Sequence, residues 1–307
     1  YKSMGQMLEG KSISVTGAGR GIGRAIAMIL AESGANVLVN DVGASAQGEG
    51  SDSSPAAEVA ADINSSGGNA VANYNSVSES ENAEAIVQTC LDKFGSVDGL
   101  VNNAGILRDT IFHKMSEEQF DVVMNVHVKG SFNMSRACAP HFRAQNSGCF
   151  VHMTSTSALI GNLAQANYMA AKLGVVGLSK SIALDMSRYN VRSNCISPFA
   201  YSRLIGTLPS ETDEQQSRLK KIKQMTPEKI APLATALFGD AAADVSGQIF
   251  AVRNNEIFLM SQPRPIRSVQ TSDGWTPETV SSRVFEAFKG SMYGLDVTAD
   301  VFTWDPV

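Results

Sequence analysis

The sequence places a phenol and an ammonium group on one face of a predicted helix. Tyr168 and Lys172 stand four positions apart within the helical pattern Ala166–Met186, so their side chains should emerge one turn apart on the same face. A tyrosine transfers protons at neutral pH only if its pKa, about 10 when unperturbed, is lowered. A nearby ammonium stabilises the phenolate. The pair therefore predicts an acid/base centre, although the same spacing is common on helix surfaces.

A glycine-rich turn near the N-terminus has the composition of a phosphate-binding loop. A β-rich run at 12–16 leads directly into it, and an amphipathic helix with Ile26 and Leu30 on its apolar side follows. Glycines permit a tight turn and let a pyrophosphate approach the backbone at the positive end of a helix. The turn reads Gly17-Ala18-Gly19-Arg20-Gly21-Ile22-Gly23. Its place at the first strand-to-helix junction predicts a dinucleotide site rather than a merely structural turn.

An acidic residue at the end of the second predicted strand favours NAD as the cofactor. Asp41 follows the glycine turn by about twenty residues, where a carboxylate can accept hydrogen bonds from the adenosine ribose. The same carboxylate would repel the 2'-phosphate of NADP. Arg20 lies inside the turn and could attract that phosphate, but Asp41 would compete for its guanidinium. We therefore expect NAD.

The order of predicted elements favours a doubly wound α/β fold. Short β-rich runs alternate with helical patterns, and parallel strands need such helical crossovers. The strands are expected at 12–16, 37–40, 70–74, 99–101, 150–153, 191–196 and 248–252, and the helices at 22–32, 56–63, 83–94, 120–142 and 166–186. We expect one Rossmann-type domain over 1–262, including the substrate cleft. A C-terminal extension, 263–307, should hold one helix that starts at Thr276 and Pro277 and has Val280, Val284 and Phe288 on one face.

Composition excludes several other classes of protein. The chain of 307 residues is 43% hydrophobic and 18% charged, as expected for a globular protein. No apolar run reaches the roughly 18 residues of a membrane-spanning helix. A net charge of -5 gives no general attraction for nucleic acid. Four scattered cysteines suggest no metal site and no disulfide framework. No signal peptide or peroxisomal address is recognisable at the ends, so we expect a cytoplasmic protein.

Four motifs in order resemble those of the short-chain dehydrogenase/reductase family over residues 8 to about 260. They are the glycine turn, Asn102-Asn103-Ala104-Gly105 after the fourth strand, Ser155, and Tyr168-Met169-Ala170-Ala171-Lys172. The resemblance implies that Tyr168 is the general acid/base, that Lys172 lowers its pKa and binds the nicotinamide ribose, and that Ser155 holds the substrate oxygen. It also implies a homodimer or homotetramer. The cofactor contacts we expect are Gly17, Arg20, Gly21, Ile22, Gly23, Asp41, Asn75, Ser76, Asn103, Ala104, Gly105, Tyr168, Lys172, Pro198 and Ser202.

Three positions depart from the family pattern. The family has an asparagine five residues before a phenylalanine in its fourth helix, where it links the lysine to water; counted back from Phe132, that position is His127. His127 is therefore a candidate for the proton relay, or else a packing residue. Asn125 could substitute only if the helix is kinked there. Asn75 replaces an aspartate that faces the adenine, and Phe199 replaces the glycine after Pro198.

A narrower resemblance concerns the substrate. The runs 102–109 and 126–128, the Gly161-Asn162 pair and the long loop after Asp41 resemble the (3R)-hydroxyacyl-CoA dehydrogenase unit of type 2 peroxisomal multifunctional enzymes and its bacterial relatives. This implies oxidation of a (3R)-hydroxyacyl-CoA, which could carry a steroid-derived acyl group. The basic cluster Arg218, Lys220, Lys221 and Lys223 could meet CoA phosphates or form a solvated helix face. A 3-ketoacyl-thioester reductase, a hydroxysteroid dehydrogenase and a non-catalytic NAD-binding regulator stay open.

Overall fold

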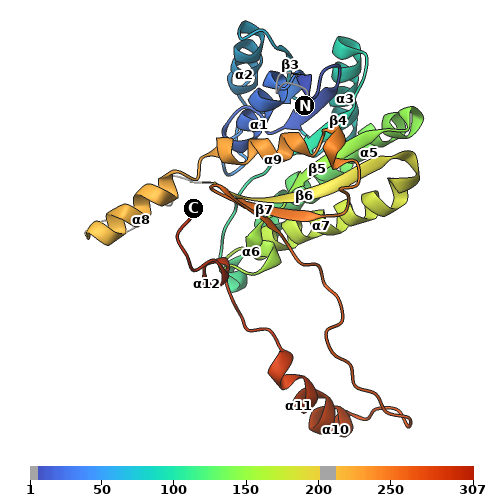
Figure 1. Cartoon of the computed structure of the whole chain (residues 1–307), viewed down its shortest axis with the longest axis vertical. Helices are drawn as coiled ribbons and strands as arrows, with labels where there is room; N and C mark the ends of the chain where they lie inside the picture. Colours follow the sequence, from blue (N-terminus) through green and yellow to red (C-terminus); the bar gives the residue numbers. More distant parts are fainter. Residues whose placement is uncertain (1–5, 201–211) are drawn as a thin grey trace.

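A single mixed sheet organises the chain (Figure 1), and the computed structural model describes residues 6–200 and 212–307. The strand order is β3-β2-β1-β4-β5-β6-β7-β8, with every neighbouring pair parallel except β7 and β8. The strands are β1 (Ser12–Thr16), β2 (Asn36–Asn40), β3 (Asn69–Asn73), β4 (Gly99–Asn102), β5 (Gly148–Met153), β6 (Val191–Phe199), β7 (Ile249–Arg253) and β8 (Glu256–Leu259). The order reverses between β1 and β4, and ligands of such sheets bind at that switch point.

Helices cover both faces of the sheet, which confirms the predicted doubly wound fold. They are α1 (Gly21–Glu32), α2 (Ser54–Ser65), α3 (Ser80–Phe94), α4 (Glu117–Met124), α5 (Gly130–Gln145), α6 (Thr156–Leu159), α7 (Ala166–Met186), α8 (Asp213–Lys223), α9 (Ala231–Ala236), α10 (Pro277–Thr279), α11 (Phe285–Phe288) and α12 (Thr298–Val301). One hydrophobic core lies under α1, α2 and α9, and the other under α3 and α5. Within the described ranges, no helix is long and apolar enough to cross a membrane.

Side chains of β5 show how the sheet separates the two cores. Val151 and Met153 belong to the core beneath α1, whereas Phe150 belongs to the core beneath α3 and α5. Successive strand residues point to opposite faces, so an almost continuous apolar run serves both layers, as in other sheets that are covered on both sides.

The predicted helix over 120–142 is interrupted. A capping box between Ser116 and Gln119 starts α4, and a π-helical turn, Asn125–Lys129, separates α4 from α5. A π-turn inserts one residue and so rotates the following side chains relative to a regular α-helix. The rotation falls at His127, one of the candidate site residues.

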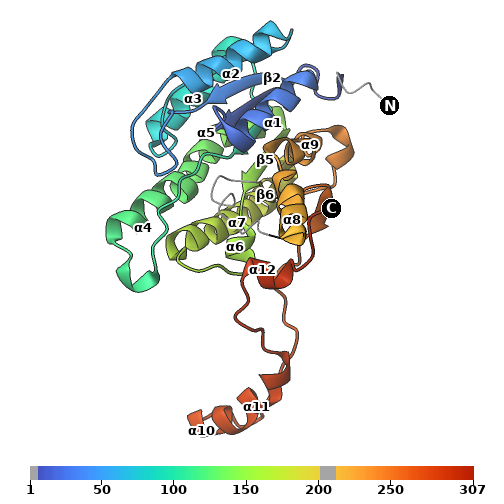
Figure 2. The same cartoon turned by 90° about the vertical axis from the view of Figure 1, so that its left-hand side faces the viewer.

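The C-terminal extension leaves the body and then returns to it (Figures 1 and 2). After β8, which the sequence pattern did not predict, the chain runs outward to α10 and α11 and comes back at α12. Helix α10 begins at Pro277, and the hydroxyl of its N-cap, Thr276, accepts a hydrogen bond from the Thr279 N–H. The sequence pattern predicted a single helix in the extension, whereas α12 also lies in it. Its continuation is a π-turn, Val280–Val284, followed by α11. Phe302, in the returning segment, is buried.

A line of polar groups crosses the buried part of the sheet. The Asn102 amide donates to Nδ1 of His152 over 3.1 Å, which leaves Nε2 to donate to the Ser193 hydroxyl, also at 3.1 Å. Ser193 and Ser179 exchange a hydrogen bond of 2.8 Å. Burial, with a smaller contribution from the charge of Lys172, lowers the pKa of His152 to about 3. The imidazole is therefore neutral in the folded protein.

We expect His152 to make the protein sensitive to acid. In the unfolded chain its imidazole takes up a proton below about pH 6.5, whereas the folded form cannot. The folded state should therefore lose about 2 kcal/mol from this residue as pH falls from 7 to 5. Urea unfolding at both pH values, compared with His152→Gln, measures this contribution as a smaller loss in the variant. An identical loss in both proteins would contradict a neutral buried His152.

Candidate active site

The three predicted catalytic residues meet where β5 ends. Ser155 caps the short helix α6 and accepts a hydrogen bond from the Ser157 N–H at 3.2 Å. Tyr168 lies in the first turn of α7 and is hydrogen-bonded to the Ser155 side chain. Nζ of Lys172 lies 5.7 Å from the Tyr168 ring centroid and donates to the Met153 carbonyl at 2.8 Å. The spacing on α7 thus places the phenol and the ammonium together, as the sequence predicts.

The protonation state of Tyr168 differs from the sequence-based expectation. Burial raises the pKa of Tyr168; the Ser155 hydrogen bond opposes this rise, and the Asp109 carboxylate adds to it. Burial also lowers the pKa of Lys172 to about 8. The expected lowering of the Tyr168 pKa is therefore wrong in direction for this structure, because desolvation is the largest cause and the Asp109 carboxylate acts in the same direction. Tyr168 is a protonated phenol at neutral pH.

His127 lies against Tyr168. Its ring meets that of Tyr168 edge-on, with centroids 5.4 Å apart and planes at 87°. Nε2 is 3.1 Å from the Ile106 backbone nitrogen and 2.9 Å from its carbonyl oxygen. Nδ1 is buried and has no hydrogen-bond partner within the part of the chain that the structure describes. Burial, and then repulsion by Lys172, lowers the pKa of His127 to about 3, so the imidazole is neutral.

Asn167 is a site residue that motif analysis did not single out. Its side chain has no exposed surface. Nδ2 donates to the carbonyls of Arg108 and Gln119, both at 2.9 Å, and Oδ1 accepts the Tyr168 N–H at 2.8 Å. These bonds fix the start of α7 against the segment that follows β4. The sequence could have indicated it, because Asn167 is a polar residue four positions before Ala171 and so lies on the buried face of α7.

The glycine turn and the Asn103 segment are held together by backbone contacts. The Thr16 hydroxyl accepts the N–H groups of Asn103 and Ala104, both at 3.1 Å. A Cβ on Gly17 would lie 2.8 Å from the Ala104 Cα, and one on Gly23 would lie 2.2 Å from the Gly17 carbonyl oxygen. These two positions therefore have to be glycine. The resulting cradle of bare backbone at the start of α1 fits a pyrophosphate.

A cavity of about 740 Å³ adjoins this cradle. Of the predicted cofactor contacts, its lining contains Gly17, Arg20, Asp41, Asn75, Ser76, Asn103, Ala104 and Gly105. Gly21, Ile22, Gly23, Tyr168, Lys172 and Pro198 are not among the lining residues, and Ser202 lies outside the described residues. The cavity therefore collects the contacts predicted for the adenosine and pyrophosphate half of a dinucleotide.

Asp41 already has hydrogen-bond partners on both carboxylate oxygens. Oδ2 accepts the Gly19 N–H at 2.8 Å, and Oδ1 accepts the Gly43 N–H at 2.7 Å. The carboxylate thus fixes the glycine turn and the start of the long loop after β2, while still facing the cavity. Asn75 donates its side-chain amide to Asn82 at 3.1 Å, and its backbone N–H and carbonyl are hydrogen-bonded to Asn73 and Asn40. Its side-chain carbonyl oxygen is the acceptor that a ligand could use.

The end of β6 and helix α8, where the sequence predicts the substrate cleft, both contact the C-terminal segment. Phe199, the residue after Pro198, packs against Phe302 of the C-terminal segment, with ring centroids 5.0 Å apart. In the basic cluster of α8, Arg218 and Lys221 form ion pairs with Asp305 at 3.6 and 3.3 Å. Two of the four cations that were candidates for CoA phosphates are therefore already paired within the chain.

Comparison with known proteins agrees with this geometry. Residues 11–202 match the family described as short chain dehydrogenase. A short-chain type dehydrogenase/reductase of Mycobacterium tuberculosis is 44% identical over 251 residues, covering 81% of this chain and 84% of that protein. A short-chain dehydrogenase crystal structure from Mycobacterium avium superposes with a TM-score of 0.82 at 33% identity, covering 95% of this chain and 99% of the other.

Two other relatives have names that indicate acyl chemistry or a larger assembly. Mouse peroxisomal multifunctional enzyme type 2 is 40% identical over 275 residues, which cover 89% of this chain but only 36% of the relative. The 3-oxoacyl-[acyl-carrier-protein] reductase of Staphylococcus aureus is 37% identical over 246 residues, covering 79% of this chain and 96% of the reductase. The family match, the shared fold and the 44% identity to a relative show that the chain belongs to the short-chain dehydrogenase/reductase family of nicotinamide-dependent oxidoreductases.

Proposed function

We propose that the protein oxidises (3R)-hydroxyacyl-CoA thioesters to 3-ketoacyl-CoA with NAD. The observation that carries this proposal is the contact of Tyr168 with Ser155 and Lys172 at the end of β5. The similarity to a multifunctional enzyme over 89% of this chain supports the acyl-CoA class. Asp41, which faces the cofactor cavity, supports NAD. Four buried free thiols suit a reducing compartment such as the cytoplasm.

The roles of the side chains follow from their positions. Ser155 donates its hydroxyl to the substrate oxygen, and Tyr168 accepts the proton that leaves the alcohol. The dinucleotide, when bound, supplies the hydride acceptor. Because burial raises the pKa of Tyr168, little phenolate is present at neutral pH, and we expect oxidation to speed up as pH rises. Lys172, with a pKa of about 8, loses its proton at a lower pH than Tyr168 does.

Reduction of 3-ketoacyl thioesters is the second candidate. It needs a protonated Tyr168 as the proton donor, which the raised pKa provides at neutral pH. The similarity to a 3-oxoacyl-[acyl-carrier-protein] reductase over nearly its full length supports it. The residues are the same in both directions, so the thioester carrier and the cofactor distinguish the two candidates.

A substrate panel tests the proposal. Initial rates are measured with (3R)- and (3S)-hydroxyacyl-CoAs of several chain lengths, with one steroid-derived acyl-CoA, and with 3-ketoacyl groups on CoA and on acyl carrier protein, using NAD(H) and NADP(H). The proposal expects the highest kcat/KM for a (3R)-hydroxyacyl-CoA with NAD. A preference for the acyl-carrier-protein ketone with NADPH would establish the reductase, and turnover of free hydroxysteroids alone would exclude both.

Tyr168→Phe should remove most turnover while NAD still binds. The change deletes one hydroxyl and leaves the ring against His127. Loss of a general acid/base costs about 10²- to 10⁴-fold in rate. We expect kcat to fall by about this factor or more, while the Kd for NAD stays within about threefold of the wild-type value. Steady-state rates and fluorescence titration measure both. A kcat within tenfold of wild type would exclude Tyr168 as the acid/base group.

Asp41 should set the preference for NAD. Its carboxylate faces the cavity and would repel a 2'-phosphate, so we expect kcat/KM for NAD to exceed that for NADP by at least about tenfold. Asp41→Asn removes the charge and keeps one side-chain oxygen, which can still accept the Gly19 N–H, while its amide nitrogen replaces the oxygen that accepts the Gly43 N–H. This variant should reduce the ratio of kcat/KM for NAD to kcat/KM for NADP, mainly by lowering KM for NADP. Equal efficiencies in the wild-type enzyme would mean that Arg20 outweighs Asp41.

Two substitutions at His127 separate a proton relay from packing. If the neutral imidazole relays protons through its unpartnered Nδ1, His127→Asn should keep much of kcat, because an amide can still bond an ordered water. His127→Leu should lose about tenfold or more. A packing role would reverse this order, since Leu fills apolar space. We expect His127→Asn to keep a higher kcat than His127→Leu, as a proton relay requires. Measurement of kcat and Tm for both variants decides, and a kcat near wild type in His127→Leu would refute it.

A further inference from the structure

The last residues of the chain touch three different elements around the active site. After the outward excursion through α10 and α11, the segment Asp296–Val307 comes back beside α6 and ends near α8 (Figures 1 and 2). Its contacts involve the loop that follows Ser155, the end of β6, and α8. These elements are far apart in the sequence, and the sequence analysis expects the substrate cleft beside them.

The first contact is at Gly161. The Thr298 N–H donates to the Gly161 carbonyl at 2.9 Å, and the Thr298 hydroxyl donates to the same oxygen at 3.3 Å. A Cβ on Gly161 would lie 2.3 Å from the Asp296 carbonyl oxygen, so only glycine permits this close approach. Gly161 follows α6, whose N-cap is Ser155. The C-terminal segment therefore contacts the loop after α6, the short helix whose N-cap is Ser155, the residue proposed to hold the substrate oxygen.

The second contact is aromatic. Phe302 is only 8% exposed and packs edge-on against Phe199 and Phe258, with ring centroids 5.0 and 5.3 Å apart. Phe199 is the residue that replaces a glycine after Pro198 in the family pattern. Phe199 therefore supplies, at the end of β6, an aromatic surface on which the C-terminal segment packs.

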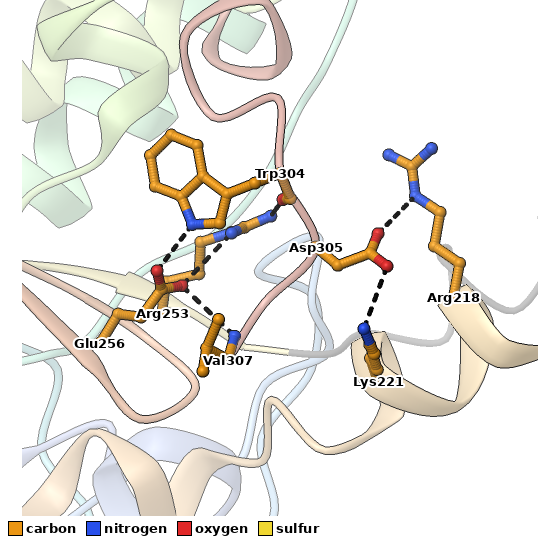
Figure 3. Close-up of polar contacts among 7 residues, drawn as sticks. All are labelled: Arg218, Lys221, Arg253, Glu256, Trp304, Asp305 and Val307. Carbon is orange, nitrogen blue, oxygen red and sulfur yellow. Dashed lines mark hydrogen bonds and ion pairs between the residues drawn. The ribbon is translucent and has the colours of Figure 1, made fainter.

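The third contact is electrostatic and reaches α8 (Figure 3). Asp305 lies between Arg218 and Lys221, with N–O distances of 3.6 and 3.3 Å. None of the described residues of α8 is buried, so the helix has little apolar packing of its own. Each ion pair is exposed and individually weak. Both share the Asp305 carboxylate, so this one side chain links the segment to α8.

The β7–β8 hairpin fixes the end of the segment in place (Figure 3). The buried Arg253 donates to the Trp304 carbonyl and pairs with Glu256 at 3.3 Å. Glu256 accepts the Trp304 indole N–H at 2.6 Å and the Val307 N–H at 3.4 Å. The Asn255 N–H donates to the Val307 carbonyl at 2.8 Å. A buried cation is costly without such partners, so the end of the segment has a defined place.

We propose that Asp296–Val307 is a positioning strap that sets the substrate entrance by holding the Gly161 loop, the end of β6 and α8 in one arrangement. The strap touches neither Tyr168 nor Lys172 among the described contacts, so it acts on how substrate is held and not on proton transfer. The identity of the substrate rests on the function proposed above, whereas the role of the strap applies to any substrate of this site.

Gly161→Ala tests the strap with one methyl group. It displaces the segment from the loop without altering a polar side chain, and Gly161 does not need a left-handed backbone. We expect KM for the substrate to rise by about tenfold, with kcat and KM for NAD within about twofold. Gly177→Ala is the matched control, because a Cβ there meets nothing within 4 Å, and it should leave all three constants unchanged.

Rescue at Asp305 makes the test independent of folding. Asp305→Asn removes the charge that pairs with Arg218 and Lys221, and should raise KM for the substrate by about threefold. Asp305→Glu should restore it. Tm is measured for all variants. An unchanged KM in both Gly161→Ala and Asp305→Asn would overturn the proposal. The proposal would also be overturned if kcat fell in proportion to Tm across the variants and Asp305→Glu did not restore it.

The two proposals fail in different ways. If wild-type enzyme does not oxidise (3R)-hydroxyacyl-CoA, the proposed function fails, and the variants are compared on whichever substrate the panel identifies. If it does oxidise the thioester but the KM ratios stay near one, the strap fails and the function stands. The ratio of variant to wild type on one substrate therefore reports on the strap alone.

Discussion

A buried ammonium at the end of β5 is the constraint from which the geometry of the site follows. Lys172 is 5% exposed, and its Nζ donates to the Met153 carbonyl at 2.8 Å. An unpaired buried cation would cost several kcal/mol, so α7 has to pack with Lys172 at the end of the strand. The same packing brings Tyr168, one turn earlier, against the Ser155 side chain. The position of one charge thus decides where the acid/base chemistry can occur.

The features that local sequence predicts well are those that one segment builds by itself. The glycine turn is recognisable because Gly17 and Gly23 have to lie against backbone, and the helix spacing alone puts Tyr168 and Lys172 on one face. The direction of the tyrosine pKa shift is not predictable in this way. It depends on how much water the folded chain excludes and on the Asp109 carboxylate, which is distant from Tyr168 in the sequence.

The contacts that sequence could not reveal join distant segments. The amide of Asn167 bonds carbonyls that lie 48 and 59 residues away, and Gly161 meets a segment whose Thr298 is 137 residues later. Neither has a periodic signature, because each depends on two loops that the sheet brings together. The short strand β8 is a different case: it follows β7 after two residues and pairs with β7 alone among the described residues, so it is a local feature that the sequence pattern did not reveal.

The departure at His127 is consistent with a site that holds a single buried cation. A Cβ on Gly105 would lie 2.4 Å from Cε1 of His127, so the imidazole fits only because the neighbouring backbone carries no side chain. Burial and the charge of Lys172 together keep its pKa at about 3. A second cation there would repel the first with little solvent to screen it. The neutral ring therefore adds no second positive charge beside Tyr168 and Lys172, which suits the acid/base role proposed for the phenol.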